Sequence, residues 1–405
     1  MAGDFASRER VIELLRTLVS VRSPYFEEDE IMSVVCAWLN GHGLPARIHE
    51  YYELKETQFH GKNVVGALTG NRPGPTIYLG GHLDTVKLCN GWTRPPFDGV
   101  VEGGRLYGVG ALDMKSGDTA IMLALEEFVK QHGDDFAGKI IYQFVSDEEG
   151  PFGLGTAAAI QENVDGLRDG VDFAIIGEPS SGFTKAPHPC IALGARGGYN
   201  FRIILDGLSS HAATPHLGVS ALVDASRVIC ALEELPPVRE EKLGESALCV
   251  VNLEMTDTAC SVPDHVEVEV FYHTVLGETQ ATIRERVEKC IEGLGLRCRW
   301  KMVFRGGLNE AEGFDGGFFP YYTDPENEYV GLLAEATREI CGCDPNYAAF
   351  QSIGDFNHFG GLLGIPTVLL GGAGERFHSH DEYVELDSVC EVAKIVFAFL
   401  NKTNN

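Results

Sequence analysis

The feature that most constrains the fold is a set of short, nearly continuous apolar runs, each ending in glycine or in charged residues. Four of them are TIYLGGHLD (76–84), KIIYQFVSDEE (139–149), VDFAIIGEPS (171–180) and IPTVLLGGAG (365–374). Runs without polar alternation are typical of strands buried on both faces. Segments with helical periodicity lie between them, such as DTAIMLALEEFVKQHG (118–133). The pattern predicts an α/β fold with a central, mostly parallel sheet flanked by helices.

The first part of the chain has the periodicity of two helices. The segment SRERVIELLRTLVSV opens with Ser7 as a predicted cap, and EEDEIMSVVCAWLNGHG has a second apolar stripe that stops at Gly41. Helices are therefore expected before the first strand.

Between residues 191 and 305 the pattern changes. Segments such as YNFRIILDG and HVEVEVFYHTV alternate apolar and polar residues, as antiparallel strands with one solvated face do. Two helical patterns lie among them. Because the earlier pattern flanks this region on both sides, we predict an inserted α+β domain at 191–305 and a main domain formed by 1–190 and 306–405.

Composition limits the partners and the cellular compartment. The 405 residues carry a net charge of −27, which argues against nucleic acid and anionic membranes because both are polyanions. There is no N-terminal signal pattern and no apolar run long enough for a membrane span. Eleven scattered cysteines without a CxxC motif indicate reduced thiols and a cytoplasmic protein. Cys341 and Cys343, in the sequence CGC, remain unassigned.

Side chains that bind metals follow the ends of these predicted strands. His82, Glu148, Glu149 and Glu178 come directly after three of them, and His378 follows the fourth. In open α/β sheets, ligands bind beyond the carboxyl ends of the strands. Each motif alone is compatible with an ordinary surface turn. Together they predict one site for a pair of borderline cations such as zinc, which imidazole and carboxylate both bind.

The adjacent acids of SDEE then have an explanation. Repulsion between neighbouring carboxylates is tolerable if the metal pair neutralises one and the other stays free as a base. Asp113 lies in a glycine-rich loop, GVGALDMKSG, just before a helix, and joins the same set.

Five ordered motifs resemble the two-zinc aminoacylase and carboxypeptidase family, which includes acetylornithine deacetylase, succinyl-diaminopimelate desuccinylase and carboxypeptidase G. They are GGHLDTV, GVGALDMKSG, SDEEG, GEPS and HSHDE. The resemblance implies that Asp113 bridges two Zn²⁺ ions, with Co²⁺ or Mn²⁺ as substitutes. It gives one ion to His82 and Glu178 and the other to Glu149 and His378, with His380 as the rival of His378.

The same resemblance implies roles for residues around the metals. Asp84 would orient the His82 imidazole, Glu148 would be the general base, and a cis peptide is expected at Asp113–Met114. The inserted domain resembles the family's lid, which usually forms a homodimer interface. Its segment LSSHAATPHLGVSAL implies that His211 reaches a neighbouring subunit's site and stabilises the oxyanion; the alternative is a structural role in its own domain.

The predicted activity is hydrolysis of the amide bond of an N-acyl amino acid or related small amide. Two alternatives stay open: a carboxypeptidase or dipeptidase acting on short peptides, and a metal-binding or regulatory protein that has lost catalysis. Glu148 counts against the second alternative, because binding alone needs no free base beside the metal.

The sequence departs from the family at positions that bind a substrate carboxylate. Cys260 replaces an Asn, His273 replaces an Arg, and Asn357 stands where Arg is common. Neither Cys nor neutral His offers the bidentate fork of Arg. We therefore predict poor binding of N-succinyl substrates and a preference for neutral acyl groups, with Arg196 as a candidate for holding the amino-acid carboxylate. The alternative is that these substitutions are neutral, because other residues of the lid take over the contacts with the substrate.

Overall fold

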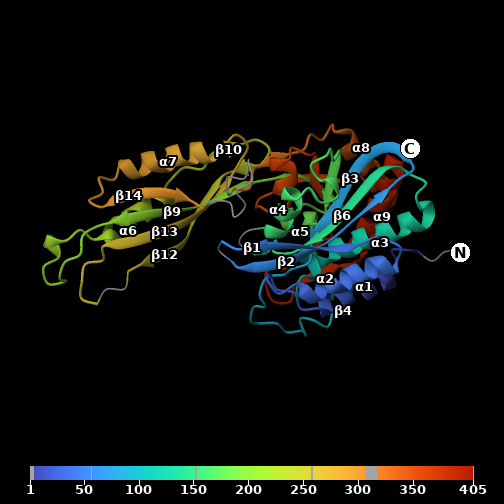
Figure 1. Ribbon diagram of the computed structural model, residues 1–405, viewed down its shortest axis with the longest axis horizontal. Coiled ribbons are helices and arrows are strands. Elements are labelled where there is room, and N and C mark those ends of the chain that lie inside the picture. Colours follow the sequence, from blue (N-terminus) through green and yellow to red (C-terminus); the bar gives the residue numbers. More distant parts are fainter. Residues whose placement is uncertain (1–3, 56, 151–152, 257–258, 306–316, 405) are drawn as a thin grey trace. The chain divides into compact units, whose positions relative to one another are not determined.

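The computed structural model describes residues 4–55, 57–150, 153–256, 259–305 and 317–404 (Figure 1). Its contacts divide the chain into a large unit, residues 1–195 with 322–405, and a small unit, residues 196–321. The limits predicted for the insertion, 191 and 305, are shifted. β8 (Cys190–Ala195) belongs to the sheet of the large unit, and Phe318 pairs with Gly198 in the small unit.

The large unit is built on a nine-stranded mixed sheet. Its order is β1-β2-β6-β3-β7-β17-β8-β15, and β16 pairs with β8. The central strands β6, β3, β7 and β17 are parallel to one another. At one side of the sheet, β2 pairs antiparallel with both β6 and β1. The bounds are β1 (Arg47–Glu53), β2 (Phe59–Thr69), β3 (Arg72–His82), β6 (Ala137–Val145), β7 (Phe173–Ile176), β15 (Tyr321–Tyr322), β16 (Asn346–Phe350) and β17 (Thr367–Leu369).

The expected N-terminal helices are present. α1 (Arg8–Ser20) is capped by the Ser7 side chain, which accepts a hydrogen bond from the Arg10 amide, and α2 (Asp29–Gly41) ends where predicted. α1 packs on α3 (Ser116–His132) and α9 (Leu386–Thr403), and α8 (Glu328–Cys341) packs on α9. The core between helices and sheet is apolar, which matches the continuous apolar runs.

Further short helices and a small sheet belong to the large unit. α4 (Leu154–Gln161) and α5 (Ser180–Thr184) follow the loops after β6 and β7. A four-stranded sheet has the order β18-β19-β5-β4, with β4 (Val100–Glu102), β5 (Arg105–Tyr107), β18 (Gly374–Glu375) and β19 (Tyr383–Glu385). A π-helical turn, η1 (Ala111–Lys115), leads into α3.

Parallel pairing places the ends of β3, β6 and β7 at one edge of the large sheet. His82 is in register with Val145, and Gly80 is in register with Ile176. The residues that follow these strands therefore emerge side by side, which is the arrangement that the sequence predicts.

The small unit is an antiparallel sheet, β12-β13-β9-β14, with helices α6 and α7. β13 has alternate residues buried, and its buried residues join both helices in one core. This confirms the predicted alternation with one solvated face. The bounds are β9 (Gly197–Asp206), α6 (Ala221–Glu233), β12 (Ala247–Met255), β13 (His265–Thr274), α7 (Gln280–Glu292) and β14 (Arg299–Phe304), and β10 (Arg239–Glu240) pairs with β11 (Gly244–Glu245).

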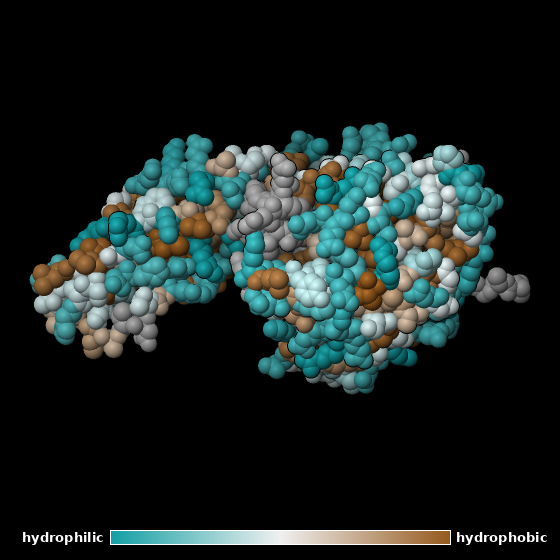
Figure 2. Space-filling view, viewed as in Figure 1, coloured by the Kyte–Doolittle hydropathy of each residue, from teal (hydrophilic) through white to brown (hydrophobic). Residues whose placement is uncertain are grey.

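Hydrophilic residues cover most of the face shown in Figure 2. Among the described residues, no helix is both long enough and apolar enough to cross a membrane. None of the eleven cysteines, which all lie among the described residues, is paired in a disulfide.

Candidate metal centre

The loops at the edge of the large sheet assemble two groups of metal-ligand side chains. One group is His82, Asp113 and Glu178, and the other is Asp113, Glu149 and His378. Within each group the ligand atoms lie within 4.8 Å of one another. The five residues predicted as ligands are thus brought together, and both groups share the residue predicted to bridge.

The two oxygens of the Asp113 carboxylate face different imidazoles. Oδ1 lies 3.3 Å from His82 Nε2, and Oδ2 lies 3.2 Å from His378 Nε2. Glu178 Oε1 lies 3.6 Å from His82 Nε2, and Glu149 Oε2 lies 2.8 Å from His378 Nε2. A carboxylate shared in this way matches a two-metal site, in which one group contacts both ions.

Backbone contacts hold Asp113 in place. The buried carboxylate of Glu382 accepts hydrogen bonds from the amides of Gly110 (3.0 Å), Leu112 (2.8 Å) and Asp113 (3.0 Å). The peptide bond from Asp113 to Met114 is cis, as expected. Gly110 adopts a left-handed conformation with φ of 71°, which glycine accepts without strain. Sequence reasoning did not assign Glu382, although it is the last residue of HSHDE.

Asp84 connects the His82 loop with the SDEE loop. Its carboxylate accepts hydrogen bonds from the amides of Glu148 (3.2 Å) and Glu149 (2.8 Å). Towards His82 Nδ1, the Asp84 backbone carbonyl is the nearer acceptor at 3.1 Å, and the carboxylate lies at 3.6 Å. The main chain of Asp84 is thus nearer to the imidazole than the carboxylate that is predicted to orient it, and the carboxylate positions both glutamates. The orienting role of the Asp84 carboxylate stays a prediction.

The first acid of SDEE has a different place from the other two. Asp147 is fully buried with φ of 59°, and its Oδ2 accepts a hydrogen bond from the Leu154 amide at the start of α4. Its own amide donates to Glu28 Oε1 at 3.1 Å. Asp147 thus shapes the loop that presents Glu148 and Glu149, a role that no sequence motif indicated.

Glu148 belongs to neither ligand group but lies beside both. Its Oε2 is 3.7 Å from His82 Nε2, and its Oε1 accepts a hydrogen bond from the Asp355 amide at 3.3 Å. Burial raises the pKa of Glu148 well above its usual range. A carboxylate beside the ligands, and not among them, is available to take and return a proton.

The cluster contains more negative than positive charge. Asp113, Glu148, Glu149 and Glu178 face two imidazoles, and Glu178 Oε2 is buried without a hydrogen-bond partner among the described residues. Burial raises the pKa of Glu178 well above its usual range and that of Glu149 to about 7. Buried carboxylates without matching cations are costly. The donor set, imidazole nitrogen with carboxylate oxygen, suits Zn²⁺ and related divalent ions.

The imidazoles respond to the same excess of carboxylates. Burial works to lower the pKa of His378, but hydrogen bonds to Asp113 and Glu149 outweigh burial and raise the pKa to about 11. A metal ligand must be a neutral imidazole, so binding of a cation by this donor set would release the imidazole protons.

The structure brings His378, and not His380, to the cluster. His378 has φ of 56°, and the next acid of this loop, Asp381, accepts hydrogen bonds from Thr93 N (2.9 Å) and Thr93 Oγ1 (2.7 Å). His380 lies against Gly91 instead, where a Cβ on that glycine would be 3.3 Å from the imidazole. The geometry therefore favours His378 as the ligand.

In the small unit, His211 is exposed beside the Cys260 segment. Residues His211 and Ser261 form a bridge, and the Ala212 amide donates to the Cys260 carbonyl at 2.9 Å. The Ala213 amide donates to His211 Nδ1 at 3.1 Å, so the neutral imidazole carries its proton on Nε2. That N–H is available as a donor to an oxyanion.

Arg196 and His273 lie close together in the small unit. Burial, and then the positive charge of Arg196, lower the pKa of His273 to about 4, so that His273 is neutral at neutral pH. In the large unit, the buried Asn357 accepts a hydrogen bond from the Gly354 amide at 2.9 Å and so holds a loop that contacts Glu148. Two of the three departures from the expected substrate-binding side chains, His273 and Asn357, thus have local structural environments of their own.

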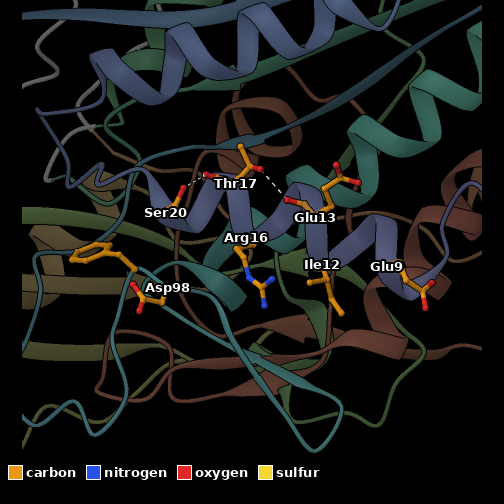
Figure 3. Close-up of a pocket in the computed structure, with 8 residues that line it drawn as sticks. Glu9, Ile12, Glu13, Arg16, Thr17, Ser20 and Asp98 are labelled. Atoms are coloured by element: carbon orange, nitrogen blue, oxygen red, sulfur yellow. Dashed lines mark hydrogen bonds between the residues drawn. The ribbon is translucent and has the colours of Figure 1, made fainter.

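A hollow along α1 contains none of the predicted site residues. Figure 3 shows Arg16 between Ile12 and Asp98, and its guanidinium donates to the Gly99 carbonyl at 3.2 Å. The other residues that line this hollow are Glu9, Glu13, Thr17, Ser20 and Phe97. The chemistry-bearing side chains lie elsewhere, at the strand ends.

Comparison with known proteins agrees with this geometry. Succinyl-diaminopimelate desuccinylase from Thioalkalivibrio sulfidiphilus is 28% identical over 338 residues, 81% of this chain and 84% of the relative. The enzyme of the same name from Psychromonas ingrahamii is 27% identical over 393 residues, 95% and 96% of the two chains.

Solved structures share the fold. The metallo-carboxypeptidase Sso-CP2 from Sulfolobus solfataricus superposes with a TM-score of 0.76 at 18% identity, covering 97% of this chain and 99% of the other. Aminopeptidase PepT from Bacillus cereus gives 0.75 at 20% identity, covering 98% and 99%. A family model, Peptidase family M20/M25/M40, matches residues 78–402. The chain therefore belongs to peptidase family M20/M25/M40, and it is a hydrolase for metal-dependent cleavage of an amide bond.

Proposed function

We propose that this chain hydrolyses the amide bond of an N-acyl amino acid or related small amide with two Zn²⁺ ions per chain. The observation that supports it is the sharing of Asp113 by two ligand groups, with Glu148 beside them and outside both. His82 and Glu178 would hold one ion, and Glu149 and His378 the other. Co²⁺ or Mn²⁺ can substitute in such a donor set.

When bound, a divalent metal pair polarises the amide carbonyl and makes water a nucleophile near neutral pH. Glu148 takes a proton from the attacking water and returns it to the leaving amine, and its contact with the Asp355 amide holds its carboxylate for both steps. Asp84 keeps His82 and the SDEE loop in a fixed relation, which pre-organises the ligands.

His211 is proposed to stabilise the developing oxyanion of a neighbouring subunit's substrate through its Nε2–H. The tautomer fixed by the Ala213 amide supports this role. A homodimer through the small unit is proposed with it. Exposed apolar side chains on the edge strand β12 and on α6 support such an interface: Val251, Met255, Leu222 and Val223. A cytoplasmic location stays a prediction.

Two alternatives remain in the proposal. Action on short peptides uses the same chemistry, whereas the desuccinylase names of the curated relatives favour an N-acyl amino acid. A binding protein without activity would not need Glu148 near the ligands.

A hydrolysis panel separates these possibilities. The protein is freed of metal with a chelator, reloaded with Zn²⁺, and tested on N-acetyl amino acids, N-succinyl amino acids and dipeptides. Hydrolysis of N-acyl amino acids that is lost on chelation and restored by Zn²⁺ is expected. Dipeptide hydrolysis alone would select the first alternative, and zinc binding without hydrolysis of any panel member would select the second.

A further inference from the structure

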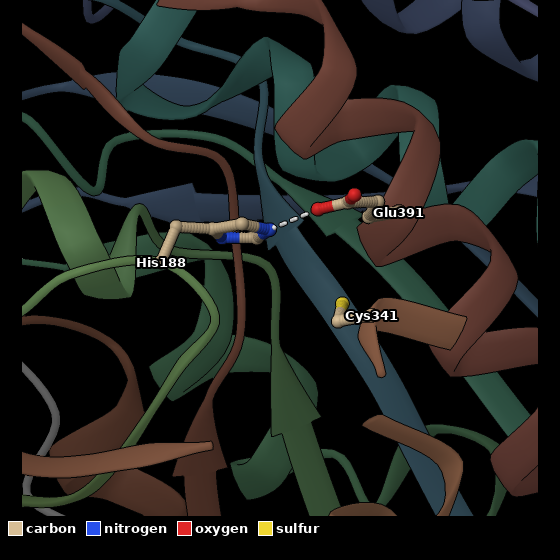
Figure 4. A group of neighbouring side chains, drawn as sticks. All are labelled: His188, Cys341 and Glu391. Atoms are coloured by element: carbon tan, nitrogen blue, oxygen red, sulfur yellow. Dashed lines mark hydrogen bonds and ion pairs between the residues drawn. The ribbon is translucent and has the colours of Figure 1, made fainter. Parts of the chain in front are cut away.

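A third group of metal-ligand side chains lies in the large unit, separate from the candidate centre in its residues. It consists of His188, Cys341 and Glu391, and Figure 4 shows them converging from three segments. Their ligand atoms lie within 4.8 Å of one another, and His188 Nε2 is 2.8 Å from Glu391 Oε2. The side chains of His188 and Glu391 are 14% and 38% exposed, so an ion from solvent can reach them.

The chain brings these donors together from distant positions. His188 precedes β8, Cys341 is the last residue of α8, and Glu391 lies in α9. Gly342, with φ of 72°, ends α8 directly after Cys341. Contact between α8 and α9 fixes the thiol and the carboxylate relative to each other. Two of the three ligands are thus built on packed helices, and the third lies in the loop directly before β8.

Within this group and among the described residues, one imidazole nitrogen has no hydrogen-bond partner, and the charge of the carboxylate is not compensated. His188 Nδ1 is buried without a hydrogen-bond partner among the described residues. Burial lowers the pKa of His188, so the imidazole is neutral at neutral pH and does not compensate the carboxylate of Glu391. In the described part of the chain, Glu391 forms no ion pair with Lys or Arg. Burial, followed by Glu391, raises the pKa of the Cys341 thiol to about 12.

We propose that His188, Cys341 and Glu391 form an additional site for a Zn²⁺-class divalent cation. One soft sulfur with imidazole and carboxylate suits Zn²⁺, and three protein ligands leave a fourth position for water. Binding releases the thiol proton to solvent, and the cation then compensates both the thiolate and Glu391. The ion joins the loop before β8 to α8 and α9, and so stabilises the folded large unit.

The site has a spectroscopic signature of its own. No predicted ligand of the candidate metal centre is a cysteine, so thiolate-to-cobalt charge-transfer absorption of the Co²⁺-loaded full chain comes from outside that centre. Loss of this absorption in Cys341→Ser then identifies Cys341 as its source. Cys343 is exposed and lies two residues away, which makes Cys343→Ser the matched control.

The unmodified, metal-free protein is titrated with Co²⁺ and monitored by near-ultraviolet absorption and by metal analysis after desalting. Thiolate absorption that saturates is expected, at an added amount of Co²⁺ that depends on how the two-ion centre competes. It should be lost in Cys341→Ser and retained in Cys343→Ser, and Cys341→Ser should hold one ion fewer per chain. A second variant, Glu391→Gln, keeps the side-chain shape and is expected to weaken Co²⁺ binding at least tenfold. Absence of thiolate absorption in the unmodified protein, or equal absorption in Cys341→Ser, would overturn the proposal.

Discussion

The two sets of predicted functional residues are held in different ways. In the large unit, two buried carboxylates hold loops of the metal centre. Glu382 accepts hydrogen bonds from three amides around Asp113, and Asp84 accepts them from the amides of Glu148 and Glu149. In the small unit, His211 is exposed and is held by local contacts: a bridge to Ser261 and a hydrogen bond from the Ala213 amide to its Nδ1. The metal ligands thus follow strand ends whose loops are held by buried carboxylates, whereas the residue predicted to stabilise the oxyanion lies on an exposed segment of the small unit.

The strongest test of this contrast removes the shared ligand. Asp113→Asn should cost the chain two ions relative to the unmodified protein and reduce hydrolysis to the background rate, because one carboxylate serves both ligand groups. Metal content after dialysis and initial rates measure the two effects. Retention of both ions would show that Asp113 does not bridge.

Two histidines of the HSHDE loop provide a matched pair for this test. His378→Ala should lose mainly one ion, while His380→Ala should lose neither, because only His378 lies beside Asp113 and Glu149. Greater metal loss in His380→Ala than in His378→Ala would reverse the assignment.

The next largest effect separates binding from proton transfer. Glu148→Gln should keep the metal content of the unmodified protein while kcat falls about 10²–10⁴-fold, since a positioned general base typically contributes that much. Loss of an ion in this variant would show that Glu148 is a metal ligand, and would contradict its assignment as a free base outside both ligand groups.

Replacing His211 in the small unit should reduce activity less than replacing Asp113 or Glu148, and should leave the metal content unchanged. His211→Ala is expected to lower kcat about 10²–10³-fold, the usual effect of removing one oxyanion donor. If His211 acts across a dimer, mixed His211→Ala and Glu148→Gln subunits should regain activity in hybrid sites. Mixtures that exchange subunits and yet show no more activity than either parent would exclude action in trans.

Much of the metal centre could be predicted because its residues directly follow apolar strands. Parallel register then forces His82, Glu148 and Glu178 to one edge of the sheet. The supporting contacts could not be predicted, since Glu382 and Asp84 bind backbone amides, and backbone amides carry no sequence signal. The limits of the insertion were shifted for a similar reason: β8 is apolar throughout, and only its pairing assigns residues 191–195 to the large sheet.

These supporting contacts suggest a smaller, separate effect. Asp84→Asn should weaken metal binding or activity about 10–100-fold, the range for residues that orient ligands, because the amide can still accept from Glu149 but loses the negative charge near His82. A metal titration measures it. An Asp84→Asn protein with unchanged metal affinity and rate would limit Asp84 to a structural role.

The smallest effect concerns substrate choice. His273 is neutral and cannot pair with a carboxylate as Arg does. His273→Arg should shift the kcat/KM ratio toward the N-succinyl form of an amino acid at least about tenfold, since a hydrogen bond to a charged group contributes about 1.5–3 kcal/mol. The N-acetyl form should be preferred by the unmodified protein, although the curated relatives are named desuccinylases. Faster turnover of the succinyl form before mutation would contradict this preference.

Anomalous diffraction from crystals of the zinc-loaded protein tests the metal centre most directly. Two zinc peaks are expected at Asp113, one within about 2.0–2.2 Å of ligand atoms of His82 and Glu178 and the other equally close to Glu149 and His378. Glu148 should lie outside both coordination shells. A single peak at Asp113, or a zinc ion coordinated by Glu148, would contradict a two-metal centre with a free general base.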